Sequence, residues 1–311
     1  MYRLTHFAKS HEPGGGIACI QVMERPAHGH GLPEAAAAKF LKARSAIFSL
    51  EPRLLTKMDI CRFNRPWAWF RFGALADVSA MNPILAEPEP YKAEGEYGDN
   101  TIPFLRLATE AKKATEPERF FAIIPLEPEK RVFAQDEFAP AEIRFLVYCG
   151  VFGGAKGIVY RGKPPRDGAG RDAFVQLNKE LQELKPLLGI SEPVEWASSQ
   201  DNNYAVKSLL CADDAILIAI FDRRYFSLQG SNKLATPVFS TAPRSVKVET
   251  KLPEGFFVSE VESVYEPLQR DCWICREGQL ELMVQMADSV QVYKATLVRN
   301  CGVGTETFKQ L

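Results

Sequence analysis

The sequence lacks the features that would point directly to nucleic acid or to a membrane as a partner. Its 311 residues carry a formal net charge of −1, so no global field attracts polyanions or an anionic membrane surface. It has no run of about 18 apolar residues, which is close to the length that a membrane-spanning helix needs. It also has no internal repeat and no low-complexity tract. We therefore expect a globular protein that binds neither nucleic acid nor membrane.

Metal-binding and redox motifs are also missing. All four histidines lie within the first thirty residues, and no His-Glu-x-x-His pattern occurs. Cys272 and Cys275 form a lone C-x-x-C, which on a strand places its two thiols on opposite faces and lacks the second pair that zinc needs. The run Gly14–Gly16 precedes a strand pattern rather than a helix, so it does not predict a phosphate-binding loop. The sequence therefore predicts no metal and no cofactor.

Neither a secretion signal nor a disulfide framework is recognisable. Residues 1–13 do not have the basic-then-apolar layout of a signal peptide, so the chain as written is expected to stay in the cytoplasm. The seven cysteines are an odd number, and most lie in apolar runs, as Cys61 does in M-D-I-C-R-F. This distribution favours scattered buried thiols over disulfides.

The amino-terminal part of the sequence alternates strand patterns with helix patterns. Strand patterns cover residues 17–23, 57–63, 74–81, 119–126 and 158–160, and helix patterns cover 33–48, 102–115, 140–152 and 172–188. A short aromatic segment at 66–72 precedes the third strand pattern, and Gly189 is a natural end for the last helix. Strands joined by helices favour parallel pairing. Residues 1–190 are therefore expected to form an α/β domain.

From about Pro193 the pattern changes to short strands separated by turns. The strand patterns cover residues 204–211, 215–221, 245–252, 256–265, 272–276, 279–286 and 290–298. The first two flank Ala-Asp-Asp, which is a hairpin signal. No helix pattern interrupts the series, so residues 191–311 are predicted to form an antiparallel β-sandwich domain.

One stretch joins a helix pattern to a strand pattern through a glycine-rich break. This stretch, A-P-A-E-I-R-F-L-V-Y-C-G-V-F-G-G-A-K-G-I-V-Y, resembles the last helix-to-strand step of clan-A-type glycoside hydrolase (β/α)8 barrels. There, a Pro-x-Glu-hydrophobic-Arg…Tyr…Gly-Ala-Lys-Gly pattern leads into the eighth strand. L-K-P-L-L-G is similar to the end of the eighth helix, and V-K-V-E-T-K-L-P is similar to part of the accessory β-sandwich that often follows.

Shorter pieces extend the resemblance towards the amino terminus. A-L-A-D-V-S-A-M-N-P resembles strand six, F-S-L-E-P-R-L-L-T the approach to strand five, and I-A-C-I-Q-V-M-E-R-P strand four. The resemblance implies a partial (β/α)8 (TIM-type) barrel, strands four to eight, plus a C-terminal antiparallel β-sandwich. A closed barrel of this type has eight strands. The first three would come from a missing upstream segment or a separate chain, and an open-sheet fold is the alternative.

The resemblance also implies a pair of catalytic carboxylates at the carboxyl ends of the strands. It places the acid after strand four and the nucleophile after strand seven, which correspond here to Glu24 and Glu127. Arg25 stands where the relatives have an acidic residue. A neighbouring cation lowers the pKa of a carboxyl group, whereas a general acid needs a raised pKa. For Glu127 the alternative is a solvated glutamate at the end of a strand.

Further residues are candidates for binding sugar hydroxyls or sugar faces. Asp77 and Asn82 carry oxygens that accept hydrogen bonds, although an internal salt bridge or a helix cap is the alternative for Asp77. Trp67 and Trp69 have rings that stack on sugar faces, or that pack a helix on the barrel. Arg161 either holds a polar ligand or pairs with a loop acid. The predicted substrate-binding residues are Asp77, Asn82, Trp67, Trp69, Tyr160 and Arg161.

Together, these patterns predict a glycoside hydrolase-like protein that acts on or binds a carbohydrate through paired carboxylates, without a cofactor. The lack of a signal peptide agrees with amino-terminal truncation of an exported parent protein, and the truncated chain alone would then be inactive. Two alternatives stay open: a non-catalytic carbohydrate-binding or assembly protein on a degenerate barrel scaffold, and an open-sheet α/β protein of unrelated function that forms a stable monomer.

Overall fold

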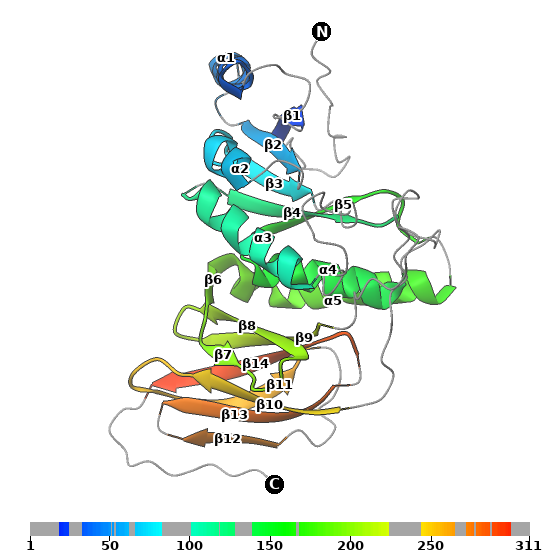
Figure 1. Cartoon of the computed structure of the whole chain (residues 1–311), viewed down its shortest axis with the longest axis vertical. Helices are drawn as coiled ribbons and strands as arrows, with labels where there is room; N and C mark the ends of the chain where they lie inside the picture. The colour runs from blue at the N-terminus through cyan, green and yellow to red at the C-terminus, as the bar shows by residue number, and fades with distance from the viewer. Residues whose placement is uncertain are drawn as a thin grey trace, which may run out of the picture.

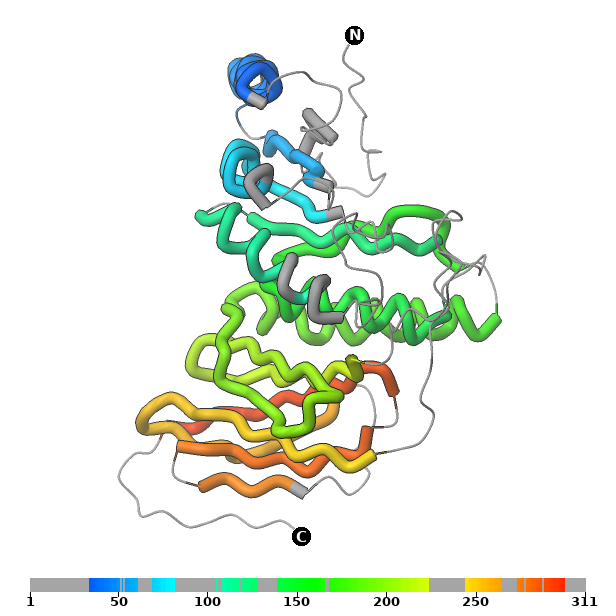
Figure 2. The backbone as a smooth tube through the Cα atoms, in the orientation of Figure 1, coloured from blue at the N-terminus to red at the C-terminus, as the bar shows by residue number. Residues whose placement is uncertain are grey.

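The computed structural model has an α/β part followed by an all-β part (Figure 1). It describes residues 19–24, 33–50, 52, 54–61, 66–82, 101–117, 119–127, 139–165, 168–223, 244–264, 272–276, 278–286 and 288–299. Figure 2 traces the same backbone, with the parallel strands towards one end of the molecule and the antiparallel strands towards the other. Within the described residues, no helix has the length and apolar character needed to cross a membrane.

The α/β part contains one sheet whose strands are ordered as they occur along the chain. Its strands are β1 (Cys19–Glu24), β2 (Leu55–Cys61), β3 (Val78–Asn82), β4 (Arg119–Pro125) and β5 (Gly157–Arg161), in the order β1-β2-β3-β4-β5. All four neighbouring pairs are parallel. Because the order never reverses and such crossovers are right-handed, successive helices fall on the same face of the sheet.

Helices cover that one face. They are α1 (Pro33–Leu50), α2 (Pro66–Phe72), α3 (Thr101–Thr115), α4 (Pro140–Phe152) and α5 (Gly168–Ile190). Met58 and Phe120, from β2 and β4, lie in the same buried apolar cluster as Phe40 of α1 and Leu105 of α3. We call this side of the sheet the helix face.

The opposite side carries the other half of each strand's side chains, because successive side chains alternate between faces. We call it the helix-free face, since no helix of the described residues covers it. Val78, Ala80 and Ile123 lie on this side and are buried, yet they belong to neither of the two apolar clusters of the described chain. Among the described residues, the helices therefore pack against one face of the sheet only.

The all-β part consists of two antiparallel sheets. Its strands are β6 (Ser191–Val194), β7 (Ala197–Ser198), β8 (Tyr204–Cys211), β9 (Ala215–Asp222), β10 (Arg244–Lys251), β11 (Phe256–Ser263), β12 (Cys272–Arg276), β13 (Gln279–Met286) and β14 (Val290–Arg299). One sheet has the order β11-β14-β9-β8-β6 and the other β12-β13-β10-β7. Apolar side chains from the two sheets, among them Ile218 and Val248, form a shared core.

Helix α4 joins the two parts. In Figure 1, α4 and α5 lie between the parallel sheet and the antiparallel sheets. The rings of Phe145 and Phe152 in α4 pack edge-on against Phe221 of β9, with centroids 5.6 and 6.2 Å apart. Strand β9 is buried along its whole length, because its alternate residues face α4 and the second antiparallel sheet. The parallel sheet and the β-sandwich therefore share one continuous apolar cluster.

The element boundaries differ from the sequence prediction at a few places. The predicted end of the last helix at Gly189 is wrong, since α5 continues to Ile190. The side chain of Lys156 donates a hydrogen bond to the Leu188 carbonyl (3.3 Å), so a carbonyl of the last turn is satisfied without a glycine cap. Strands β6 and β7 were not predicted. Pro193 lowers the strand signal of β6, and edge strands, of which β6 is one, tolerate proline.

Candidate functional site

The candidate catalytic residues stand at the carboxyl edge of the parallel sheet. Glu24 is the last residue of β1, and Glu127 follows β4. Asn82 and Arg161 are the last residues of β3 and β5. Parallel strands end at the same edge of a sheet, so the backbone brings these four residues to one side of the molecule. The side chains of Glu24 and Asn82 lie outside the described part of the structure.

Glu127 is exposed, and the connection between β5 and α5 holds its side chain. Its Oε1 accepts a hydrogen bond from the backbone N–H of Lys163 at 3.2 Å. Gly162 has a φ of +105°, and a Cβ atom at this position would lie 3.3 Å from Cγ of Glu127. The positive φ and the close approach both favour glycine at this turn. The turn therefore positions Glu127 beside the end of β5.

The two candidate carboxylates are not on neighbouring strands. Strands β2 and β3 lie between β1 and β4, and three strand spacings of roughly 4.8 Å amount to about 14 Å along the sheet. Glycoside hydrolysis by two carboxylates uses separations of about 5 to 9.5 Å.

Asp77 does not lie within a strand, as the sequence prediction had placed it. Strand β3 begins one residue later, so Asp77 stands at the amino edge of the sheet, opposite Glu127. Its carboxylate accepts hydrogen bonds from the N–H and the hydroxyl of Thr56, both at 2.7 Å, and forms a salt bridge with Arg44. Burial alone would raise the pKa of Asp77, but the Thr56 hydrogen bonds and the Arg44 charge together lower it. The structure thus shows the internal salt bridge that was the alternative.

Trp69 is part of the core. It is 2% exposed, and its ring packs edge-on against Phe120 of β4 with centroids 6.2 Å apart. The aromatic segment 66–72 is helix α2, which turns Trp69 towards the helix face of the sheet. Trp69 therefore makes the packing contact that was the alternative to sugar stacking, because its ring is covered on the helix face. The side chain of Trp67 lies outside the described residues.

Tyr160 also faces the helices. Its ring packs against Phe174 of α5 at 4.9 Å, and its hydroxyl donates a hydrogen bond to Oδ1 of Asn178 at 3.3 Å. Burial raises the pKa of Tyr160 to about 12. Its contacts therefore pack β5 against α5, while Arg161 is the next residue along the strand and alternates to the other side. Arg161 is exposed at the carboxyl edge.

The most specific part of the sequence resemblance packs helices together. Glu142 accepts a hydrogen bond from the N–H of Ala139 and so caps α4. Arg144 and Tyr148 of α4 both donate hydrogen bonds to Glu180 of α5, which is almost fully buried. Burial raises the pKa of Glu180 above its ordinary value even though Arg144 opposes that shift. These residues hold α4 and α5 together rather than forming a site.

The Gly-Gly-Ala-Lys-Gly turn after α4 fixes the start of the all-β part. Lys156 donates hydrogen bonds to the carbonyls of Leu188 and Ser191. The carboxylate of Glu192 in β6 lies 3.7 Å from Lys156 Nζ and 3.2 Å from Lys112 Nζ of α3. Partial burial lowers the pKa of Lys156 although Glu192 opposes that effect. The turn is therefore a structural junction between the two parts.

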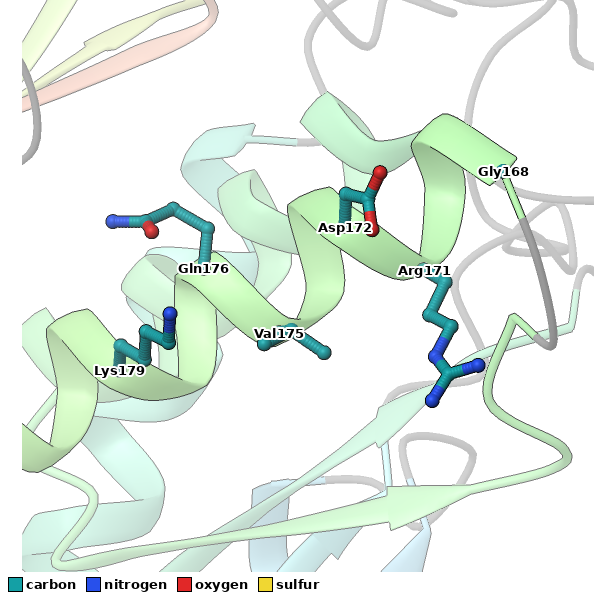
Figure 3. A pocket seen from close by; sticks show the side chains of 6 residues that line it. All are labelled: Gly168, Arg171, Asp172, Val175, Gln176 and Lys179. Atoms are coloured by element: carbon teal, nitrogen blue, oxygen red, sulfur yellow. The ribbon is translucent and has the colours of Figure 1, made fainter.

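Two surface hollows are weaker candidates for a ligand site than the carboxyl edge of the parallel sheet. Figure 3 shows the first, whose lining side chains all come from α5 and project from a single helix. Its lining residues are Gly168, Arg171, Asp172, Val175, Gln176 and Lys179. The second lies where α3 and α4 meet β6 and β8 and is lined by the ion pairs of Lys112 and Lys207. The first draws on a single helix, and in the second Lys112 and Lys207 are already paired with Glu192 and Glu195.

The residues considered for metal or redox chemistry lie only partly within the described ranges. In those ranges, no three His, Cys, Asp or Glu side chains are grouped to hold a metal ion. The C-x-x-C sequence lies on β12, and Cys275 is a free thiol. The four histidines lie outside the described residues.

Strand β2 carries an ion pair that the sequence did not predict. Lys57 and Asp59 are 2% and 7% exposed, and Lys57 Nζ lies 2.6 Å from Asp59 Oδ1. Both belong to the alternate set that faces away from the helices, while Met58 and Ile60 enter the core. The available signal was the T-K-M-D-I-C pattern, which places two charges on one face of an otherwise apolar strand.

Comparison with known proteins identifies the fold but no sequence relative. No family model matches the sequence, and no curated protein sequence matches it. A glycoside hydrolase family 5 structure from Bacteroides vulgatus ATCC 8482 is similar, with a TM-score of 0.55 and 13% identity over 88% of this chain and 61% of that chain. A structure titled glycoside hydrolase has a TM-score of 0.52 and 12% identity over 86% of this chain and 63% of that chain.

A third similar structure extends the comparison to another glycoside hydrolase. Alpha-galactosidase I from Mortierella vinacea has a TM-score of 0.53 and 10% identity over 88% of this chain and 67% of that chain. The chain spans 61% and 63% of the length of the first two structures. At this identity, the likeness concerns the fold alone. The fold of this chain is glycoside hydrolase-like.

Proposed function

We propose that this chain is part of a protein that acts on or binds a carbohydrate, with Glu24 and Glu127 as its paired carboxylates. The observation that carries this proposal is that both residues stand at the carboxyl edge of one parallel sheet. Active sites of (β/α)8 enzymes lie at that edge. In the proposed reaction, Glu24 protonates the leaving oxygen and Glu127 attacks the sugar or activates water.

The proposed architecture is strands four to eight of a (β/α)8 barrel (residues 1–190), followed by a β-sandwich domain (residues 191–311). Two observations support it: the strand order never reverses, and the chain spans only 61% and 63% of two similar structures. A closed barrel has eight strands. Three further strand–helix units would therefore come from an upstream segment or from a separate chain, and closure would shorten the path between Glu24 and Glu127.

Asn82 and Arg161 remain the substrate-binding candidates at this edge. Each ends a strand that neighbours β4, which leads to Glu127. An amide and a guanidinium both offer hydrogen bonds to sugar hydroxyls. Asp77, Trp69 and Tyr160 no longer belong to the proposed site, because their contacts lie at the amino edge or on the helix face.

The test is hydrolysis of a panel of p-nitrophenyl glycosides by a polypeptide that carries the missing upstream units. Glu24→Gln and Glu127→Gln should each lower the rate by about 10²- to 10⁴-fold, the usual range for an acid or base catalyst. Glu183→Gln on the exposed side of α5 is the matched control and should leave the rate unchanged. If both site variants keep the wild-type rate, the proposed catalytic pair is wrong.

A non-catalytic carbohydrate-binding protein is the second candidate. The specific observation in its favour is the sequence Glu24-Arg25-Pro26, in which a cation follows the proposed acid. A cation next to a carboxyl group favours its charged form, and a general acid must be protonated. Measurable binding of oligosaccharides without hydrolysis of any glycoside in the panel would establish this second candidate.

A further inference from the structure

Only one oxygen of the Glu127 carboxylate has a partner among the described residues. Oε1 accepts a hydrogen bond from the backbone N–H of Lys163 at 3.2 Å. Within the described ranges, no hydrogen bond or ion pair reaches Oε2. The side chain is exposed at the carboxyl edge of the sheet. The carboxylate is thus held at one oxygen and open at the other.

Backbone hydrogen bonds fix the end of β4 against the end of β5. Pro125, the last residue of β4, pairs with Arg161, the last residue of β5. One residue further along, the N–H of Leu126 donates a hydrogen bond to the carbonyl of Arg161 at 2.8 Å. The pairing of the two strands therefore continues to the residue directly before Glu127 and sets where its side chain begins.

The turn that follows β5 lies directly against the Glu127 side chain. A Cβ atom at Gly162 would stand 3.3 Å from Cγ and 3.4 Å from Cδ of Glu127. The φ of Gly162 is +105°, which side chains rarely allow. Only glycine satisfies both conditions, so this residue lets the N–H of Lys163 approach the carboxylate.

Both residues of this hydrogen bond precede a proline in the sequence. Glu127 is followed by Pro128, and Lys163 is followed by Pro164. A residue before proline is largely restricted to extended backbone conformations. The donor and the acceptor therefore both have limited backbone freedom, which favours a fixed orientation of the carboxylate.

We propose that the Lys163 N–H is a positioning donor, which holds Oε1 of Glu127 so that Oε2 faces the sugar; this inference rests on the proposed function. An ionised carboxylate only accepts hydrogen bonds, so a backbone N–H suits the attacking form. In the reaction, Oε2 bonds to the anomeric carbon, or accepts a proton from the attacking water, while the leaving oxygen takes a proton from Glu24. Fixing the orientation of a reacting group raises the rate although the donor does not touch the sugar.

Removal of the N–H tests this role in the chain extended by the proposed upstream units. Lys163→Pro lacks the donor, whereas Lys163→Ala keeps it and loses only the side chain. We expect Lys163→Pro to lower kcat for the p-nitrophenyl glycoside that is cleaved fastest by about tenfold or more, with KM within about twofold of wild type. Lys163→Ala should retain most of the wild-type kcat. An equal loss in both variants would assign the effect to the lysine side chain and overturn the inference.

A spectroscopic readout on the chain of 311 residues needs no substrate. In protein with isotope-labelled lysine, the amide resonance of Lys163 is the one that is absent from Lys163→Ala. Its proton should move upfield as acid protonates Glu127, because a neutral carboxyl group is a weaker acceptor than a carboxylate. Glu127→Gln should abolish that movement. A Lys163 amide that does not respond to pH, or that responds equally in Glu127→Gln, would contradict the inference.

The outcomes separate the inference from the proposed function. A wild-type rate for Lys163→Pro, with Glu127→Gln still impaired, would overturn the inference and leave the proposed function in place. Absence of both hydrolysis and oligosaccharide binding by the wild type would overturn the proposed function, and the positioning role with it. A loss of kcat confined to Lys163→Pro, together with the amide response, would establish the Lys163 N–H as the positioning donor.

Discussion

The polar and aromatic residues on the two faces of the parallel sheet have different roles. On the helix face, Trp69 and Tyr160 are covered by neighbouring elements and serve packing. On the helix-free face, β2 buries the ion pair of Lys57 and Asp59. Beyond the strands, Glu127 is exposed at the carboxyl edge. The face to which a residue belongs, rather than its chemical type, separates the structural residues from the candidate site residues.

The largest expected effect is on the helix face. Trp69→Ala removes a buried ring that packs against Phe120. Truncation of a buried tryptophan or phenylalanine to alanine typically costs about 3 to 5 kcal/mol. Urea unfolding followed by circular dichroism measures this loss. A change below about 1 kcal/mol would show that α2 does not belong to the core and would weaken the contrast between the faces.

The second prediction concerns the ion pair between Arg144 and Glu180, which links α4 to α5. Arg144→Met leaves the buried carboxylate of Glu180 without its cation. Removing one partner of a buried ion pair costs about 3 to 5 kcal/mol, and the partial exposure of Arg144 places the expected loss near the low end, about 3 kcal/mol. Replacing both partners, with Arg144→Met and Glu180→Gln, should restore part of the stability. Equal unfolding midpoints for wild type and Arg144→Met would contradict this role.

The turn that positions Glu127 should show a smaller effect on stability. Gly162→Ala places a methyl group 3.3 Å from Cγ of Glu127 at a φ of +105°. The strain of a left-handed alanine should cost about 1 kcal/mol. Gly189→Ala is the control, since Gly189 lies in α5 with open space around it and no positive φ. A Gly162→Ala protein as stable as wild type would show that this turn does not constrain Glu127.

The smallest expected effect is on the pH dependence of stability, to which Asp77 at the amino edge of the sheet contributes. The pKa of Asp77 is lowered in the folded protein, so its contribution to stability is present above its unfolded pKa of about 3.9 and is lost as pH falls through the folded value. Asp77→Asn should therefore flatten the fall in stability between about pH 4 and the folded pKa. Urea midpoints for both proteins over that range provide the measurement. Parallel curves would contradict the assigned salt bridge with Arg44.

Much of the fold followed from local patterns. The 3.6-residue spacing before Phe152 predicted α4, and the turn signal at Ala212–Asp214 predicted the β8–β9 hairpin; the structure confirms both. The alternation of strands and helices correctly indicated a parallel sheet. Such patterns are local, so one sequence suffices to recognise them.

The candidate site was harder to predict, because a residue's role depends on which face or edge it occupies. Strand β3 begins at Val78, whereas the predicted strand began at residue 74. Asp77 therefore lies at the amino edge of the sheet, away from the carboxyl edge where the candidate site lies. A difference of one residue along β5 separates Tyr160 on the helix face from Arg161 on the other. The ion pair of Lys57 and Asp59 was missed because burial depends on tertiary contacts that no local pattern encodes.

The most direct test of this contrast compares Glu127→Gln with Tyr160→Phe in this chain extended by the proposed upstream units. The two residues lie near the ends of neighbouring strands, but Tyr160 contacts α5 whereas Glu127 contacts the turn after β5. The measurement is the initial rate of p-nitrophenyl glycoside hydrolysis at 25 °C. The predicted result is a loss of about 10²- to 10⁴-fold for Glu127→Gln and a rate within about twofold of wild type for Tyr160→Phe. Equal rates for Glu127→Gln and wild type, or an equal loss for both variants, would contradict the account.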